Sequence, residues 1–431
     1  MARANRADLK DLAALFLRLG ATAFGGPAAH VSMMEHEVVT RRGWMTREEF
    51  LDLLGATNLA PGPNSTKMAL FIGHARAGWA GFLLAGIGFV LPATLLVTVF
   101  AWAYVRFGSL PAFPHFFEGI KPIVLALIAH ALVGLGRTAV KNRFLLALGL
   151  AALAASFFVH ELVLLLVAGC VSAGAMEFED LLRKGRGGSA QEGPAARTGN
   201  ASPNGPASGV AAPPLPERAE GAEPHAPSKK SLLNSSSLPP SKKSSLLFLP
   251  LFSLGVPLSS FSLSSLFLFF LKTGAVLFGS GYVLLAYLKA DLVERWHWLT
   301  SAQLLDAVAV GQFTPGPLSS TATFIGYVLG GLPGAAVATL GIFLPAFALV
   351  AVMGPFVPRL RQSLFLGAFL DGVNVAALAL MGYVTLQFAR PALTNGPTVA
   401  LFLASVAILS TVRINAAWLV LAGGILGLLF G

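Results

Sequence analysis

Charged residues are scarce in this chain. Only 12% of its 431 residues are Asp, Glu, Lys or Arg, and 55% are hydrophobic. A soluble domain carries about 25% charged residues. The mean hydropathy is +0.72, and apolar runs long enough to cross a bilayer recur towards both ends of the chain. The composition therefore excludes an ordinary soluble protein and predicts a protein embedded in the lipid bilayer.

Cysteine is almost absent as well, because Cys170 is the only one. A lone cysteine excludes an internal disulfide and any metal site built from several cysteines. His30, His74 and His130 have no metal-ligand spacing to one another or to acidic residues, so we expect no metal site and no cofactor. There is no phosphate-binding loop of the Walker type, which argues against an ATP-driven pump.

Acidic residues are fewer than basic ones, and the net charge is +10. The excess lies in the tails and in one central linker, so it indicates cytoplasmic loops of a membrane protein rather than a nucleic-acid partner. No small-residue cleavage site follows the basic N-terminus, and we expect the first helix to be retained.

One stretch interrupts an apolar segment: Pro61-Gly62-Pro63, followed by Asn64, Ser65, Thr66 and Lys67. Two prolines and a glycine cannot remain inside a regular helix. Asn64, Ser65 and Thr66 are residues that start a new helix. Thr46 and Glu49 have the spacing of a capping box, so a helix is expected to begin near residue 47 and to end at this break.

The second half of the chain repeats the first, at an offset of 254 residues that becomes 253 after one deletion. Phe24-Gly25 matches Phe278-Gly279, Trp44 matches Trp298, and the first Pro-Gly-Pro matches Pro315-Gly316-Pro317. We predict an all-α polytopic membrane protein with two homologous repeats, residues 1–182 and 263–431. Each repeat is expected to contain five or six transmembrane helices and a helix broken by Pro-Gly-Pro. Five spans per repeat give inverted repeats and six give parallel ones, and the sequence leaves this open at ten to twelve spans.

Residues 183–262 separate the repeats and are rich in Pro, Ser and Lys. They read as a disordered linker with an apolar tail, and their basic residues place them in the cytoplasm.

Broken helices in duplicated membrane proteins are typical of secondary transporters, whose substrate sites lie at the half-helix ends. The unpaired N–H groups and partial positive charge of such an end form an anion site. Lys67 is expected to neutralise part of the charge of a dianion. The alternative is that Pro-Gly-Pro is only a kink or a loop. The candidate substrate-binding residues are Pro61, Gly62, Pro63, Asn64, Ser65, Thr66, Lys67, Pro315, Gly316, Pro317, Ser319, Ser320 and Thr321.

Two further groups are weaker candidates. Each repeat has a glycine-containing motif near its first helix, and these glycines fit either an anion path or close helix packing. The candidate residues of the two motifs are Phe24, Gly25, Gly26, Pro27, Phe278 and Gly279. Acids in or beside apolar segments fit either proton coupling or capping of helix N-termini near the interface; these are Glu118, Asp371, Asp52 and Asp306.

The ordered motifs Phe-Gly-Gly-Pro, Trp-Met-Thr and Pro-Gly-Pro-Asn-Ser-Thr, with their second-half partners, resemble the chromate ion transporter family in its long two-domain form. The resemblance covers both repeats. It implies a bacterial-type inner-membrane protein, not an enzyme, that exports chromate with the proton-motive force and confers chromate resistance. Sulfate, an isosteric dianion, is the implied competitor, and a homodimer stays open. Two departures are the long linker and Leu318, which stands where the first repeat has Asn64.

Three alternatives remain at this point. The first is a carrier of sulfate or another oxyanion. The second is an integral-membrane enzyme acting on lipid-linked phosphates, which predicts acids and histidines clustered at one interface. The third is a scaffold or sensor that uses the linker as its output.

Overall fold

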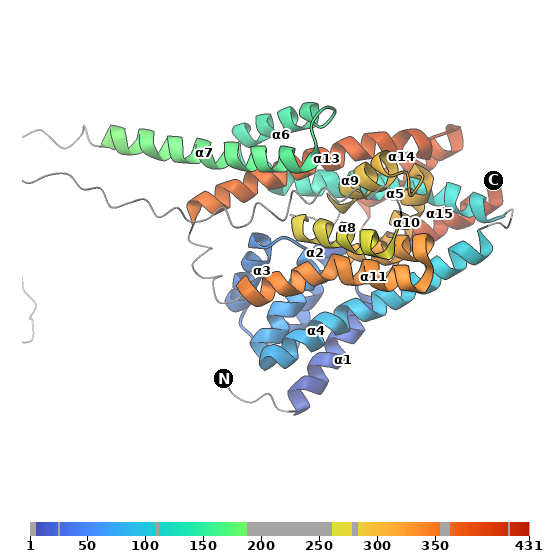
Figure 1. Cartoon of the computed structure of the whole chain (residues 1–431), viewed down its shortest axis with the longest axis horizontal. Helices are drawn as coiled ribbons and strands as arrows, with labels where there is room; N and C mark the ends of the chain where they lie inside the picture. The colour runs from blue at the N-terminus through green and yellow to red at the C-terminus, as the bar shows by residue number, and fades with distance from the viewer. Residues whose placement is uncertain are drawn as a thin grey trace, which may run out of the picture. The chain divides into compact units, whose positions relative to one another are not determined.

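The computed structural model describes residues 6–24, 26–108, 110, 112–187, 261–277, 283–353, 363–412 and 414–430. Over these residues every regular element is helical, which confirms the predicted all-α class (Figure 1). The first repeat consists of α1 (Arg6–Thr22), α2 (Gly26–Glu35), η1 (His36–Arg41), α3 (Arg47–Leu59), α4 (Asn64–Phe107), α5 (Ala112–Ala139), α6 (Arg143–Ala155) and α7 (Glu161–Gly187).

The second repeat follows the same order of elements. It consists of α8 (Leu263–Val276), α9 (Leu284–Tyr287), η3 (Leu288–Arg295), α10 (Ser301–Phe313), η4 (Leu318–Ser320), α11 (Thr321–Met353), α13 (Leu364–Ala392), α14 (Gly396–Thr411) and α15 (Ala416–Phe430). Capping boxes at Thr46 and Thr300 start α3 and α10, as the sequence predicts for α3. The part of the expected linker beyond α7, residues 188–260, lies outside the described residues.

The long helix α4 is a hairpin of two helices. Its backbone leaves the helical conformation at Ala77 and Gly78, where Gly78 has a φ of +59° that favours glycine. After this turn the backbones of Gly73 and Gly81 lie against each other, so residues 64–76 run back along residues 79–107. Helix α11 has the same break at Gly330 and Gly331.

Helix α3 and residues 64–76 form a second hairpin with Pro61-Gly62-Pro63 at its tip. Arg76, at the end of the half-helix, lies 5.3 Å from the ring centre of Trp44, which precedes α3. A 13-residue helix such as α3 is about 20 Å long, and the apolar core of a bilayer is about 30 Å thick. The two arms are therefore too short to cross it, and the hairpin is re-entrant.

The two repeats are inverted relative to each other. Helices α5 and α13 occupy matching positions, and Gly136 of α5 lies beside Leu378, whereas the earlier Leu132 lies beside the later Gly382. The matching helices are thus antiparallel, which decides between the two orientations that the sequence leaves open. We call the helix ends near Asp8, Trp44, Arg76 and Lys141 the proximal face, and those near Arg106, Phe261 and Trp298 the distal face.

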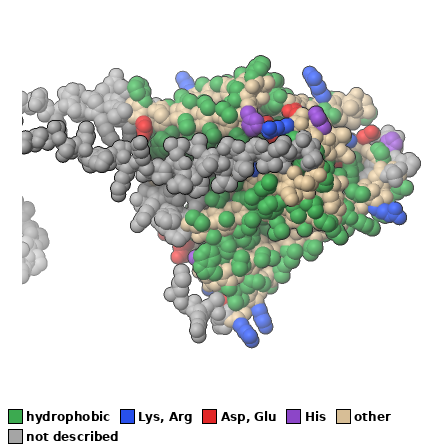
Figure 2. All heavy atoms as spheres, in the orientation of Figure 1, with side chains coloured by type: hydrophobic (Ala, Val, Ile, Leu, Met, Phe, Trp, Pro, Cys, Tyr) green, Lys and Arg blue, Asp and Glu red, His purple; other side chains and the backbone are tan. Residues whose placement is uncertain are grey.

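An apolar outer surface identifies the lipid-facing side. Leu83, Ile87, Leu91 and Leu95 recur every four residues on α4 and all are exposed. Figure 2 shows hydrophobic side chains covering the surface over α4 and α11. Five helices of the described part are long and apolar enough to span a membrane, and four further apolar helices are shorter. The protein is a multi-pass membrane protein.

Candidate functional site between the two helix breaks

Each Pro-Gly-Pro tip docks against the end of the first helix of the other repeat. The Gly62 N–H donates to the carbonyl of Leu277 at 2.6 Å, and the Gly316 N–H donates to the carbonyl of Ala23 at 2.8 Å. Both glycines have positive φ, +108° and +94°, which side-chain-bearing residues rarely adopt. The tips are therefore fixed between the repeats rather than being free loops.

His30 on α2 joins the first tip to the second. Its Nε2 lies 3.0 Å from the Ala23 carbonyl and its Nδ1 lies 3.0 Å from the Ser65 hydroxyl. Because a carbonyl only accepts, Nε2 carries the proton, and in the neutral imidazole Nδ1 accepts from Ser65. Since Ala23 also accepts from Gly316, a chain of hydrogen bonds runs from Ser65 to Gly316. The two interruptions therefore meet through these residues.

Buried hydroxyls surround this junction. Thr66, Ser319 and Ser320 are at most 1% exposed, and their hydroxyls have no hydrogen-bond partner among the described residues. The half-helices behind the tips begin after Pro63 and Pro317, and neither has a side-chain cap. Their first N–H groups also lack acceptors within the helix. We call Ala23, His30, Gly62, Ser65, Thr66, Gly316, Ser319 and Ser320 the central site.

Lys67 is fully buried, but it faces the re-entrant hairpin itself. Its Nζ donates to the carbonyl of Thr57 at 2.5 Å and to the carbonyl of Ala60. These carbonyls lie at the C-terminal end of α3, where the helix carries a partial negative charge. Lys67 therefore joins the two arms of the hairpin, and its charge is placed on α3 rather than pointing freely towards a ligand.

The four candidate acids fall into three different environments. Glu118 is largely exposed and lies near His115, and Asp371 is paired with Lys141 at 2.6 Å on the proximal face. Asp52 is exposed on α3, whereas its repeat partner Asp306 is buried. The structure does not bring the four acids together.

Asp306 belongs to a buried polar cluster at the contact between the repeats. The Tyr104 hydroxyl donates to its carboxylate at 3.0 Å, and the Lys121 ammonium lies 3.7 Å away. Tyr104 and Lys121 come from α4 and α5 of the first repeat, and Asp306 from α10 of the second. The cluster therefore connects the re-entrant hairpin of one repeat to the long helices of the other.

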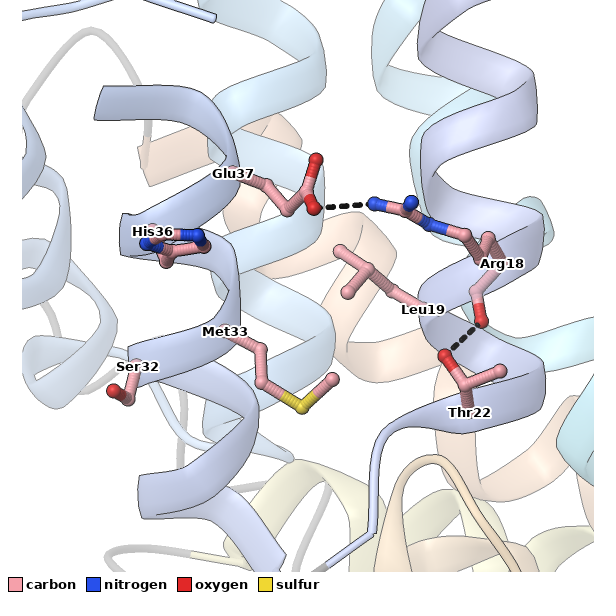
Figure 3. Close-up of a pocket in the computed structure, with 7 residues that line it drawn as sticks. All are labelled: Arg18, Leu19, Thr22, Ser32, Met33, His36 and Glu37. Atoms are coloured by element: carbon pink, nitrogen blue, oxygen red, sulfur yellow. Dashed lines mark hydrogen bonds and ion pairs between the residues drawn. The ribbon is translucent and has the colours of Figure 1, made fainter. Parts of the chain in front are cut away.

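A cavity of about 360 Å³ lies beside α1 and the α2–η1 helix. In Figure 3 Arg18 points from α1 towards Glu37, while Ser32 and His36 project from the other side of α2–η1. The cavity is lined by Arg18, Leu19, Thr22, Ser32, Met33, His36 and Glu37.

Glu37 holds three arginines at this cavity. Arg41 and Arg42 lie 3.1 and 3.3 Å from its carboxylate, and Arg18 pairs with it as well. Burial alone raises the pKa of the Glu37 carboxyl, but hydrogen bonds from Arg41, Arg18 and Arg42 outweigh burial and hold the pKa below its usual value. Three guanidinium groups around one carboxylate leave the proximal end of the cavity cationic.

Comparison with known proteins decides the family. A family model described as chromate transporter matches residues 10–175 and 264–428. The chain belongs to the chromate transporter family. Both matched regions coincide with the two repeats, and no solved structure matches the chain.

Curated relatives of this chromate transporter family member extend over most of its length. A chromate transport protein of Cupriavidus metallidurans is 31% identical over 93% of this chain and 88% of its own. A probable chromate transport protein of Synechococcus elongatus is 30% identical over 91% of this chain and 87% of its own. A chromate transport protein of Pseudomonas aeruginosa is 30% identical over 97% and 91%.

The sequence-derived residues of this family member fall into three groups. Both Pro-Gly-Pro segments and the hydroxyls behind them lie at the junction, although the Thr321 hydroxyl donates to the Leu318 carbonyl. Phe24, Gly26 and Pro27 lie at the start of α2 and are half-buried. Gly25, Phe278 and Gly279 lie outside the described residues. In the described part of the chain, no group of three His, Cys, Asp or Glu side chains could hold a metal ion.

Sequence reasoning missed His30, Lys121 and Tyr104. The spacing of His30 speaks only about metal binding, whereas its position in an apolar helix just after Phe24-Gly25-Gly26-Pro27 is the available signal. Lys121 is a cation within an apolar segment, which is by itself a sign of function or pairing. Nothing in the sequence singles out Tyr104, because its partner is 202 residues away.

Proposed function

We propose that this protein is a secondary transporter that exports chromate across the bacterial inner membrane, driven by the proton-motive force, and so confers chromate resistance. The observation that carries the proposal is the central site. Two uncapped half-helix N-termini supply backbone N–H donors, and the buried hydroxyls of Thr66, Ser319 and Ser320 can each donate one further hydrogen bond. A tetrahedral dianion is rich in acceptor oxygens and suits them.

The orientation follows from the distribution of charge. Arg41, Arg42, Arg76, Arg137 and Lys141 gather at the proximal face. Cytoplasmic loops carry an excess of Lys and Arg. The proximal face is therefore the cytoplasmic one, and chromate enters the protein from this side.

The test is uptake of radiolabelled chromate into everted membrane vesicles, with and without a protonophore. Thr66→Val and Ser320→Ala remove hydroxyls from the central site, and Ser410→Ala, an exposed hydroxyl bonded within its own helix, is the matched control. A hydrogen bond to a charged group is worth about 1.5–3 kcal/mol, so the affinity is expected to fall about 10- to 100-fold.

Sulfate is the second candidate substrate, because the same donors suit any tetrahedral dianion. Uptake of labelled sulfate but not chromate would change the substrate and leave the site in place. Uptake of neither anion, or equal uptake by the Ser320→Ala and Ser410→Ala proteins, contradicts the proposed site.

A further inference from the structure

The two repeats share a sequence pattern but not a state of packing. In the second repeat, buried residues of α8, α9, η3 and α10 belong to one large core that also contains residues of α5 and α13. In the first repeat, the buried residues of α1, α2, η1 and α3 form a separate core with both arms of α4. We call α1–α3 with residues 64–76 the first re-entrant unit, and α8–α10 with residues 318–329 the second.

Exposure of matched residues measures this difference. Leu51 on α3 is 48% exposed, whereas its partner Leu305 on α10 is 0% exposed. Asp52 is exposed, whereas Asp306 is 6% exposed. A half-exposed leucine is tolerated against lipid or water, but an exposed acid on the same turn is unfavourable against lipid and ordinary against water. The open side of α3 therefore faces an aqueous space.

The cavities show the same asymmetry. The cavity of about 360 Å³ beside the first unit includes Ser32 and His36. Ala286 and Ala290 occupy the matching positions of the second unit, and the cavity that they line, on the side of α7 and α13, is only about 20 Å³. Side chains from α7 and α13, among them Glu161 and Tyr383, line the rest of it.

We propose that the structure shows one of the two states of an alternating-access cycle, open to the proximal face beside Ser32 and Asp52 and closed at the distal face by the Lys121–Asp306–Tyr104 cluster. In the other state the first unit packs on α13, where Asn374 matches Lys121 and faces Asp52, and the second unit separates from α5. This inference rests on the proposed transport function. It assigns Lys121, Asp306 and Tyr104 as the residues that hold the distal gate, acting on access rather than on the anion.

The inversion of the repeats makes this exchange physically symmetric. Antiparallel repeats place equivalent surfaces at opposite faces, so exchanging the conformations of the two units converts a proximal opening into a distal one. The central site lies between the tips of both units and is reached from either side. Removal of one partner of a buried ion pair is strongly destabilising, whereas removal of both is far less so. Single neutral substitutions in the cluster should therefore open the distal gate, and the double substitution should restore its closure in part.

The test uses single cysteines at matched positions, Ser32→Cys and Ala286→Cys, in full-length protein with Cys170→Ser. Labelling rates with a membrane-impermeant maleimide are measured in spheroplasts and in inverted vesicles. In the otherwise unchanged protein, the cysteine at position 32 should react from the cytoplasmic side, and the one at 286 at least about ten-fold more slowly from either side. Asp306→Asn or Lys121→Met should raise labelling at 286 from the periplasmic side and lower it at 32, and combining the two should reverse both changes in part.

Reciprocity is the decisive readout. Rapid labelling at 286 in the unchanged protein overturns the inference. A rise at 286 without a fall at 32 also overturns it, because it shows local loosening at the distal gate. If the gate variants do not fold, the inference is still tested by comparing the labelling of the two cysteines in protein with the unchanged gate. Labelling needs no substrate, so reciprocal labelling with no effect of added chromate or sulfate would sustain the gate and refute the proposed substrates.

Discussion

Gly62→Ala offers a sharp test of how the Pro-Gly-Pro tip is held. A methyl group at this position would lie 3.0 Å from the Ala346 Cβ and 3.4 Å from its Cα on α11. The φ of +108° adds backbone strain of about 1–3 kcal/mol for a residue other than glycine. Overpacking adds about 1–3 kcal/mol. The free energy of unfolding should therefore fall by about 2–6 kcal/mol, and the tip should move away from Leu277.

Gly43→Ala is the matched control. Gly43 also has a positive φ, +60°, but a methyl group there meets nothing within 4 Å. It should therefore show only the strain, about 1–2 kcal/mol. The assay is the thermal midpoint of the detergent-purified protein, together with chromate uptake. Combining Gly62→Ala with Ala346→Gly removes the methyl group that the new side chain contacts, so part of the lost stability should return. The recovery is reduced by about 1 kcal/mol, because a glycine within a helix is itself destabilising.

Two outcomes would refute this reasoning. One is an equal effect of Gly62→Ala and Gly43→Ala, which would show that the contact with α11 contributes nothing. The other is a double variant no more stable than Gly62→Ala alone, which would place the cause in the backbone only.

Lys67→Met leaves the carbonyls of Thr57 and Ala60 without their charged donor, and the thermal midpoint should fall by the equivalent of about 1–3 kcal/mol; an unchanged midpoint would show that Lys67 does not join the arms of the hairpin. Glu37 bears on pH dependence: its pKa is depressed below 4.5, so its stabilising pairing is complete above this value and is lost only as the pH falls through the folded-state pKa. Glu37→Gln should therefore lower stability at neutral pH by more than at acid pH, and it should leave the shape of the uptake profile above about pH 5.5 unchanged; a shifted profile there would show that Glu37 titrates in that range.

The repeated helix break was predictable because it depends on local chemistry. Proline at positions 61 and 63 removes backbone donors, and the capping box at Thr46 fixes where α3 begins. The duplication then implied that the second half would fold in the same way, and it does. The sequence also places the end of the short helix after the break at about residue 77, where the structure has its turn, but it could not show that residues 64–76 fold back along residues 79–107.

Lys67 and Asp52 show where sequence reasoning about the site stops. A lysine behind a helix break reads as an anion ligand, yet its reach back to the carbonyls of α3 depends on the fold of the hairpin. Asp52 and Asp306 are the same residue in the same motif, and the sequence gives no reason to separate them. Their difference arises from long-range packing, because α10 lies against α5 of the other repeat and α3 does not share that core.

The orientation of the repeats and the asymmetry of the acids support each other. If the repeats were parallel, both re-entrant units would open to the same face, and different packing of the two would serve no transport step. Because α5 and α13 are antiparallel, a buried Asp306 and an exposed Asp52 correspond in the proposed cycle to a closed distal face and an open proximal face. A transporter needs this combination at every stage of its cycle, since two simultaneous openings would let ions leak. Asp52→Leu should therefore favour the closed proximal state, because it places an apolar side chain at the proposed aqueous opening, and slower labelling of a cysteine at position 32 would reveal it. Faster or unchanged labelling at that position would show that α3 does not close on α13.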